Sequence, residues 1–206
     1  MMFDEIKSAF IENKLAIYVA IAVFFISMIL GYVFEPNLYS YFNPVVEDLT
    51  QKVQSGTVKL TFADIFFNNI KIVFQMFIYG VVFCFSILLL AFNGFFTGYY
   101  VAISGNLFYT LLLIIPHAIF EFSSCILACA SGLVLFRFMH GFLNSIWHQD
   151  EKSAKLILWD SFNENSTRLK QAVIIFIMAS VLMAIAGFVE TYLTIPIAKA
   201  IISVLS

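Results

Sequence analysis

Charged residues are almost absent from three long stretches of this chain. The segments 15–34, 72–136 and 171–198 contain only Glu121 and Glu190 as charged residues. The 206 residues nevertheless include 11 lysines and arginines and 13 aspartates and glutamates, so the charges are concentrated in the remaining segments. Such segregation is typical of a protein in a lipid bilayer, because an ion in hydrocarbon costs several kcal/mol. The pattern predicts an all-α integral membrane protein.

The apolar segments predict a polytopic helical bundle with about five transmembrane spans, because about 20 apolar residues cross the hydrocarbon core as a helix. The second span is expected to stop at Asn93-Gly94. The third is expected to be discontinuous, since Gly98 and Gly105-Asn106 divide it into pieces too short to cross alone, and Pro116 fits the first turn of the fourth. One membrane domain is expected over residues 1–206, with spans near 15–34, 72–92, 94–115 (broken), 117–139 and 172–192.

Two polar segments, 35–71 and 140–170, are expected at the membrane surface. The first should hold an amphipathic helix that begins at Asn43-Pro44 and a second helix with a capping box at Thr61 and Asp64. In 140–170, tryptophans beside lysines indicate a helix lying in the interface. Lysines and arginines are more numerous around this segment, so the positive-inside rule predicts a multi-pass cell-membrane protein with its amino terminus and 140–170 in the cytoplasm.

The charge balance also bears on partners. The formal net charge is -2 and no basic patch interleaved with aromatics occurs, which excludes a typical nucleic-acid binder. The lipid bilayer is therefore the expected partner. Small residues on the helix faces would also permit a homo-oligomer.

Polar side chains stranded in apolar sequence are the candidates for a functional site. His117 and Glu121 are four residues apart, so they project from one face of a helix. This spacing suits a shared metal ion or a hydrogen-bonded acid/base pair. Glu190 is expected at the same depth in the last span. The candidate ligands of a divalent metal ion are thus His117, Glu121 and Glu190, with Asn69 and Asn93 as further intramembrane polar residues.

Three interpretations of this cluster are open on the sequence alone. The side chains could pair and lock helices together, or bind a proton or metal ion as in a small transporter or channel. A metal-dependent intramembrane hydrolase is the third, although no H-E-x-x-H pattern is present. Cys125 and Cys129 continue the same helix face, where the small residues favour close packing over metal binding.

Four short motifs occur in an order that resembles the stage II sporulation protein M family. They are Asp64-Ile65-Phe66-Phe67-Asn68-Asn69, Asn93-Gly94-Phe95-Phe96-Thr97-Gly98, Pro116-His117-Ala118-Ile119-Phe120-Glu121, and the segment from Ala186 to Pro196. Ala118 departs from the pattern, since the family usually has glycine there.

The resemblance implies a polytopic membrane protein that is not an enzyme. In endospore-forming bacteria the family member acts in engulfment as a scaffold that localises cell-wall hydrolases. A scaffold or membrane-remodelling factor that contacts other membrane or cell-envelope proteins is therefore one expectation. A small transporter or channel that uses His117, Glu121 and Glu190 is the alternative.

Overall fold

The computed structural model describes residues 2–55, 61–147 and 154–205, and its regular elements there are all helical. The predicted all-α class is confirmed. The elements in chain order are α1 (Met2–Glu12), α2 (Lys14–Val33), α3 (Glu35–Gln54), α4 (Phe62–Tyr79), α5 (Phe83–Ile103), α6 (Leu107–Trp147), α7 (Ala154–Phe188), a π-helical turn η1 (Val189–Leu193) and α8 (Thr194–Leu205).

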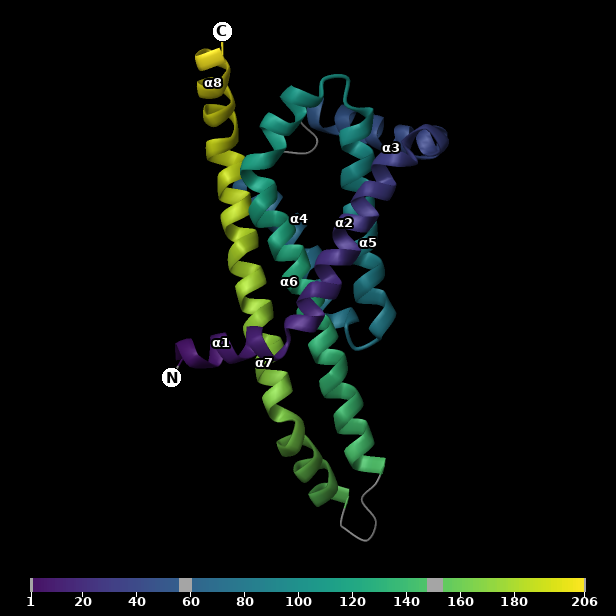
Figure 1. Cartoon of the computed structure of the whole chain (residues 1–206), viewed down its shortest axis with the longest axis vertical. Coiled ribbons are helices and arrows are strands. Elements are labelled where there is room, and N and C mark those ends of the chain that lie inside the picture. The colour runs from purple at the N-terminus through teal and green to yellow at the C-terminus, as the bar shows by residue number, and fades with distance from the viewer. Residues whose placement is uncertain (1, 56–60, 148–153, 206) are drawn as a thin grey trace.

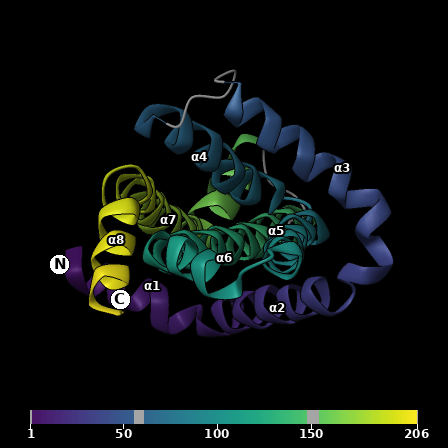
Figure 2. The ribbon, with the colours of Figure 1, turned by 90° about the horizontal axis from the view of Figure 1, so that it is seen from above.

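The bundle is built around α6. This helix contacts α2, α4, α5, α7 and α8, and Figure 2 shows α2 and α4 on opposite sides of it. Its middle part is buried and rich in small residues, among them Ala128, Cys129 and Gly132. Small side chains let neighbouring helices approach closely, which is how helices associate in lipid.

Four helical segments are long and apolar enough to cross a membrane: Lys14–Val33, Phe85–Ile103, Leu107–Trp147 and Lys155–Val204. Large apolar side chains are exposed on their outer faces, for example Ile26 on α2 and Ile177 on α7. α4 also runs beside α6 and α7, but it carries Asp64 and Lys71 and is not among the four. The membrane-spanning bundle is confirmed, with four such segments where the sequence predicted about five spans.

The expected span 72–92 is divided in the structure. A turn at residues 80–82 ends α4 and starts α5, with three successive backbone bonds between residues three apart, from Gly80, Val81 and Val82 to Phe77, Ile78 and Tyr79. The physical reason is the sequence Gly-Val-Val, since glycine and β-branched residues are poor helix formers. The boundary expected at Asn93-Gly94 was wrong, because α5 continues through it.

Gly94 and Gly98 are contact points between α5 and α2, and this is why they do not break the helix. A Cβ atom on Gly94 would lie 2.6 Å from the carbonyl oxygen of Phe24, and one on Gly98 would lie 1.9 Å from that of Met28. The chain does break at Ser104–Asn106, as predicted for Gly105-Asn106. The discontinuity therefore separates two long helices, α5 and α6.

Two prolines lie inside continuous helical structure, Pro116, which was expected at the start of a span, and Pro196, which was expected to begin a short apolar tail. Pro116 is within α6, which runs unbroken from Leu107. Pro196 is in the first turn of α8, which continues directly from α7 through η1. The spans expected at 117–139 and 172–192 are therefore parts of much longer helices. Proline is tolerated in such helices because neighbouring groups satisfy the freed backbone.

The segment 140–170 is not a helix lying in the membrane plane. Its described residues, 140–147 and 154–170, are the end of α6 and the beginning of α7, two arms that extend side by side beyond α1 and are called the α6–α7 hairpin below (Figure 1). Buried Asn165 joins the two arms, since its amide donates to the Ser145 hydroxyl at 3.3 Å. The surface helix expected in this segment was wrong, because α6 and α7 continue as regular helices beyond their most apolar parts.

At the opposite end α3 lies across the long axis, as expected for a surface helix (Figure 1). It begins at Glu35 and contains Pro44, so the start expected at Asn43 was wrong. The expected cap of α4 is confirmed, because the Thr61 side chain accepts a hydrogen bond from the Asp64 backbone N–H at 3.3 Å.

Candidate functional site

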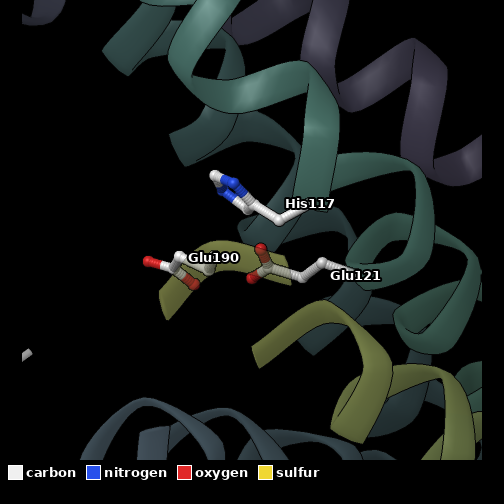
Figure 3. Close-up of side chains that lie close together, drawn as sticks. All are labelled: His117, Glu121 and Glu190. Atoms are coloured by element: carbon white, nitrogen blue, oxygen red, sulfur yellow. The ribbon is translucent and has the colours of Figure 1, made fainter. Parts of the chain in front are cut away.

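His117, Glu121 and Glu190 lie side by side between α6 and η1 (Figure 3). One ligating atom of each residue lies within 4.8 Å of the others, and all three side chains are partly buried. His117 and Glu121 reach out from consecutive turns of α6, as their spacing predicted. The structure thus brings together the three residues that the sequence selected as metal ligands.

The depth of the cluster follows from its distance along α6. Arg137 marks the level of the α1–α2 junction, since its guanidinium donates to the Asn13 side chain at 3.3 Å. Glu121 lies 16 residues earlier in the same helix, which corresponds to about 24 Å at 1.5 Å per residue. The cluster therefore lies about 24 Å along α6 from that junction, toward the end of the bundle where α3 and α8 lie (Figure 1).

The π-helical turn positions Glu190. Inward-facing residues recur every fourth position, at Ala186, Glu190, Thr194 and Ala198. In a regular α-helix each such step rotates the side chain by about 40°, so Ala198 would lie about 120° away from Ala186. A π-turn takes up one additional residue, which corresponds to about 100° and restores the alignment. Glu190 and α8 can therefore face α6 together.

Thr194 is the neighbour of the cluster that sequence reasoning missed. Its hydroxyl lies 3.4 Å from Nδ1 of His117 and donates to the carbonyl of Val189 at 3.2 Å. Thr194 is buried, whereas the preceding Leu193 is exposed. The available signal was its position four residues after Glu190 in an apolar segment, a spacing that places both side chains on one helix face.

The donor set is one imidazole nitrogen and two carboxylates. These are the ligand types of zinc and of other divalent transition metals. Two carboxylates at this separation repel each other when both are ionised, and the repulsion is large where water is scarce. A bound cation or a shared proton relieves it. The arrangement therefore fits a divalent cation with three protein ligands.

The face of α6 that follows Glu121 toward Gly132 is packed against other helices, and among the described residues it adds no ligand to the cluster of His117, Glu121 and Glu190. Cys125 and Cys129 are buried with free thiols and are not part of the three-residue cluster. Ser124 donates across the interface to the carbonyl of Ala179 at 2.7 Å. Their burial is the arrangement expected if these small side chains serve helix packing, the role that the sequence favoured over metal binding.

Asn69 and Asn93 have no described bond to the three ligands. Asn69 is partly buried on α4, where its side chain accepts a long contact of 3.5 Å from Asn68. Asn93 is partly buried on α5, which packs against α2, α4 and α6. Their inclusion as intramembrane polar residues stays a prediction.

The other side of α6 at this level is apolar. A cavity of about 300 Å³ between α2, α5 and α6 is lined by residues that include Tyr32, Gly98 and Ala118. Ala118 directly follows His117 in α6, yet Ala118 lines the apolar cavity whereas His117 belongs to the polar cluster. The departure from the usual glycine therefore affects the cavity and leaves the ligand face intact.

A second polar cluster, which was not predicted from the sequence, holds α1 against the bundle. The Asn13 amide, only 3% exposed, donates to the Gln171 side chain at 2.9 Å. Gln171 in turn donates to Glu12 at 2.7 Å. Hydrogen bonds from Ser8 and then Gln171 lower the pKa of Glu12 below its ordinary value. This cluster holds the junction of α1 and α2 against α6 and α7.

Comparison with known proteins places the chain in a family. It is 28% identical to the uncharacterized protein MJ0706 of Methanocaldococcus jannaschii, over 98% of this chain and 92% of that protein. It is 26% identical to the uncharacterized protein MJ0793 of the same organism, over 92% of this chain and 99% of the relative. No solved structure matches the chain significantly. The model of the family "Stage II sporulation protein M" matches residues 20–195. The chain, a helical protein with membrane-spanning segments, therefore belongs to the stage II sporulation protein M family.

Proposed function

We propose that this chain is a non-enzymatic scaffold of the cell membrane whose cluster of His117, Glu121 and Glu190 binds a divalent transition-metal cation. The observation that supports it is the convergence of one nitrogen and two oxygen ligands, each within 4.8 Å of the others. Because the ligands come from α6 and η1, the cation would fasten the α7–α8 arm to the central helix. Its role is then to hold the shape that partner proteins recognise.

Zinc is the cation that the ligands favour. Zinc accepts nitrogen and carboxylate ligands in tetrahedral sites with only three protein ligands, and water can take the fourth position. Calcium needs six to eight oxygen ligands, which is more than this cluster offers. Binding of zinc also neutralises the two carboxylates, so the site would be stable in an apolar environment.

The packing below the cluster supports binding over permeation. Along α6, residues 124–135 are buried apart from Leu127 and are mostly small or apolar. At the far end of this stretch α4 touches α6 so closely that a Cβ atom on Gly80 would lie 2.3 Å from the Cα of Gly132. A cation that left the cluster in this direction would have to separate packed helices.

A partner surface for the scaffold is offered by the α6–α7 hairpin. Trp147 is 85% exposed and Trp159 is 64% exposed, although both are large apolar side chains. Exposed aromatic residues of this kind are enriched where proteins bind one another. We propose that this hairpin and the amino terminus face the cytoplasm, in accordance with the excess of lysine and arginine around the hairpin.

A transporter is the second candidate, and the π-turn favours it. Single π-turns inside α-helices occur frequently at functional sites, and η1 places such a turn at Glu190. The two candidates differ in one measurable property. A transporter moves the cation across a bilayer, whereas a scaffold holds it.

Metal content and zinc affinity test the binding site. The purified protein should carry about one zinc per chain after dialysis against zinc and gel filtration, as three protein ligands suffice for one ion. His117→Gln and Glu190→Gln should lose it, while His140→Gln, on the same helix but outside the cluster, should retain it. Equal, substoichiometric zinc in the wild type and His117→Gln would refute the proposal.

Proteoliposomes that contain a zinc-sensitive dye separate the two candidates. The scaffold predicts the same slow zinc entry as in protein-free vesicles. Zinc entry that Glu121→Gln and Glu190→Gln abolish, in variants that stay folded, would establish the transporter and overturn the scaffold.

A further inference from the structure

The cluster contains one hydrogen-bond chain that determines which nitrogen of His117 is free. It runs from the imidazole Nδ1 to the Thr194 hydroxyl at 3.4 Å, and from this hydroxyl to the carbonyl of Val189 at 3.2 Å. Thr194 is buried, and Val189 is also buried. His117 is partly buried, so the Thr194 hydroxyl and the Val189 carbonyl are the members of the chain with little access to water.

The direction of the chain follows from its last member. A carbonyl oxygen only accepts, so the hydrogen of the Thr194 hydroxyl points to Val189. The hydroxyl then faces His117 with a lone pair, which can only accept. A favourable contact requires the proton of the neutral imidazole to be on Nδ1, because the alternative places two lone pairs opposite each other.

The π-turn makes the carbonyl of Val189 reachable from Thr194. The backbone N–H of Thr194 also bonds to this carbonyl, five residues back, as π-helical geometry requires. Thr191 shows the ordinary alternative, since its hydroxyl donates to the carbonyl of Gly187 four residues back at 2.8 Å. Thr191 has no described contact with His117, so its hydroxyl makes a similar bond to the backbone but is not connected to the imidazole.

We propose that Thr194 is a positioning residue that keeps the proton of His117 on Nδ1 and so presents Nε2, with its free lone pair, to the cation. The inference rests on the proposed cation site for its purpose, but the location of the proton is a property of the metal-free protein. Partners that orient a ligating histidine in this way raise metal affinity and fix the ring.

The first test locates the proton without any metal. Nitrogen NMR of protein labelled in its three histidines distinguishes the two neutral tautomers, and His117→Gln assigns the His117 signals. At a pH where the ring is neutral, the wild type should show the Nδ1–H form, and so should Thr191→Val. Thr194→Val should shift His117 toward the Nε2–H form, whereas Thr194→Ser, which keeps the hydroxyl, should behave as the wild type. An Nε2–H form in the wild type overturns the proposal.

The second test measures zinc affinity by calorimetry on the same proteins. Thr194→Val should bind zinc about 10–100-fold more weakly, which is the usual effect of removing a partner of a ligating histidine. Thr191→Val and Thr194→Ser should keep the wild-type affinity. An unchanged affinity in folded Thr194→Val overturns the proposal, while a wild type that binds no zinc refutes the cation site and leaves the NMR test to decide the role of Thr194.

Discussion

Substitution of Gly98 by alanine should weaken the contact between α2 and α5. The two helices touch through three glycines, Gly31, Gly94 and Gly98, at each of which a Cβ atom would lie within 3.0 Å of an atom of the other helix. At Gly98 the nearest atoms would be the carbonyl oxygen of Met28 at 1.9 Å and the backbone nitrogen of Tyr32 at 3.0 Å. Both belong to the backbone, so no side chain can rotate away to make room.

The magnitude follows from the displacement that the added methyl group requires. Ordinary contact begins at 3.4 Å, so the carbonyl of Met28 must retreat by about 1.5 Å, which moves α2 as a whole. Overpacking of this kind costs about 1–3 kcal/mol. Alanine regains up to about 1 kcal/mol, because it is the better helix former. We expect a net loss of about 1–2 kcal/mol, equivalent to a melting temperature lower by about 2–8 °C.

In a Cys84→Ser background, a thiol-reactive fluorophore can measure this loss in detergent, since buried Cys125 and Cys129 react only as the bundle opens. Gly105→Ala is the matched control, because a Cβ atom there would meet nothing within 4 Å. The control should melt at the wild-type temperature or slightly above it. If Gly98→Ala and Gly105→Ala melt alike, the glycines do not set the distance between α2 and α5 and the reasoning is wrong.

Three further predictions concern other contacts. Ser124→Ala should lower the unfolding free energy by about 0.6–1.7 kcal/mol through loss of its bond to α7, while Ser123→Ala, which loses only a bond within α6, should have little effect in the same assay. Asn13→Ala should cost about 1–3 kcal/mol, measured by thermal unfolding, because it removes the donor to the Gln171 side-chain oxygen and the acceptor of the Arg137 guanidinium. The lowered pKa of Glu12 predicts that its contribution is complete above the ordinary glutamate pKa and is lost as the pH falls through the lowered value; hydrogen exchange of α1 should then accelerate at acid pH, and Glu12→Gln should abolish this dependence.

The convergence of the cluster could be foreseen because a bilayer leaves few places for a carboxylate. Glu121 and Glu190 are the only charged residues in their apolar segments, so shelter inside the bundle was the expected solution. The position of His117 one turn from Glu121 followed from helical spacing alone. The use of this cluster as a cation site stays a prediction.

The helix boundaries were harder to foresee, because glycine and proline have two roles in membrane helices. Gly94 was interpreted as the end of a helix and Pro116 as the start of one, yet both lie inside continuous helices. A packing glycine and a breaking glycine differ only in whether another backbone approaches, and this depends on the partner helix. Gly80, by contrast, does end a helix, where two valines follow it.

Thr194 and Asn13 were missed for a related reason. The role of each comes from a partner distant in sequence, His117 for the threonine and Gln171 for the asparagine. No local spacing connects such pairs. Only the register between helices, set here by η1 and by the α1–α2 junction, brings them within reach.

The π-turn also bears on how relatives of this chain should be aligned. It contains one residue more than the α-helical turn that it replaces, so loss of a residue such as Tyr192 would give a regular helix. Glu190 would still point in the same direction relative to the side chains of α7, and Thr194 would do so relative to those of α8. Homologues of either length could therefore present the same two side chains, and an alignment that forbids a one-residue gap here would pair the threonine with the wrong position.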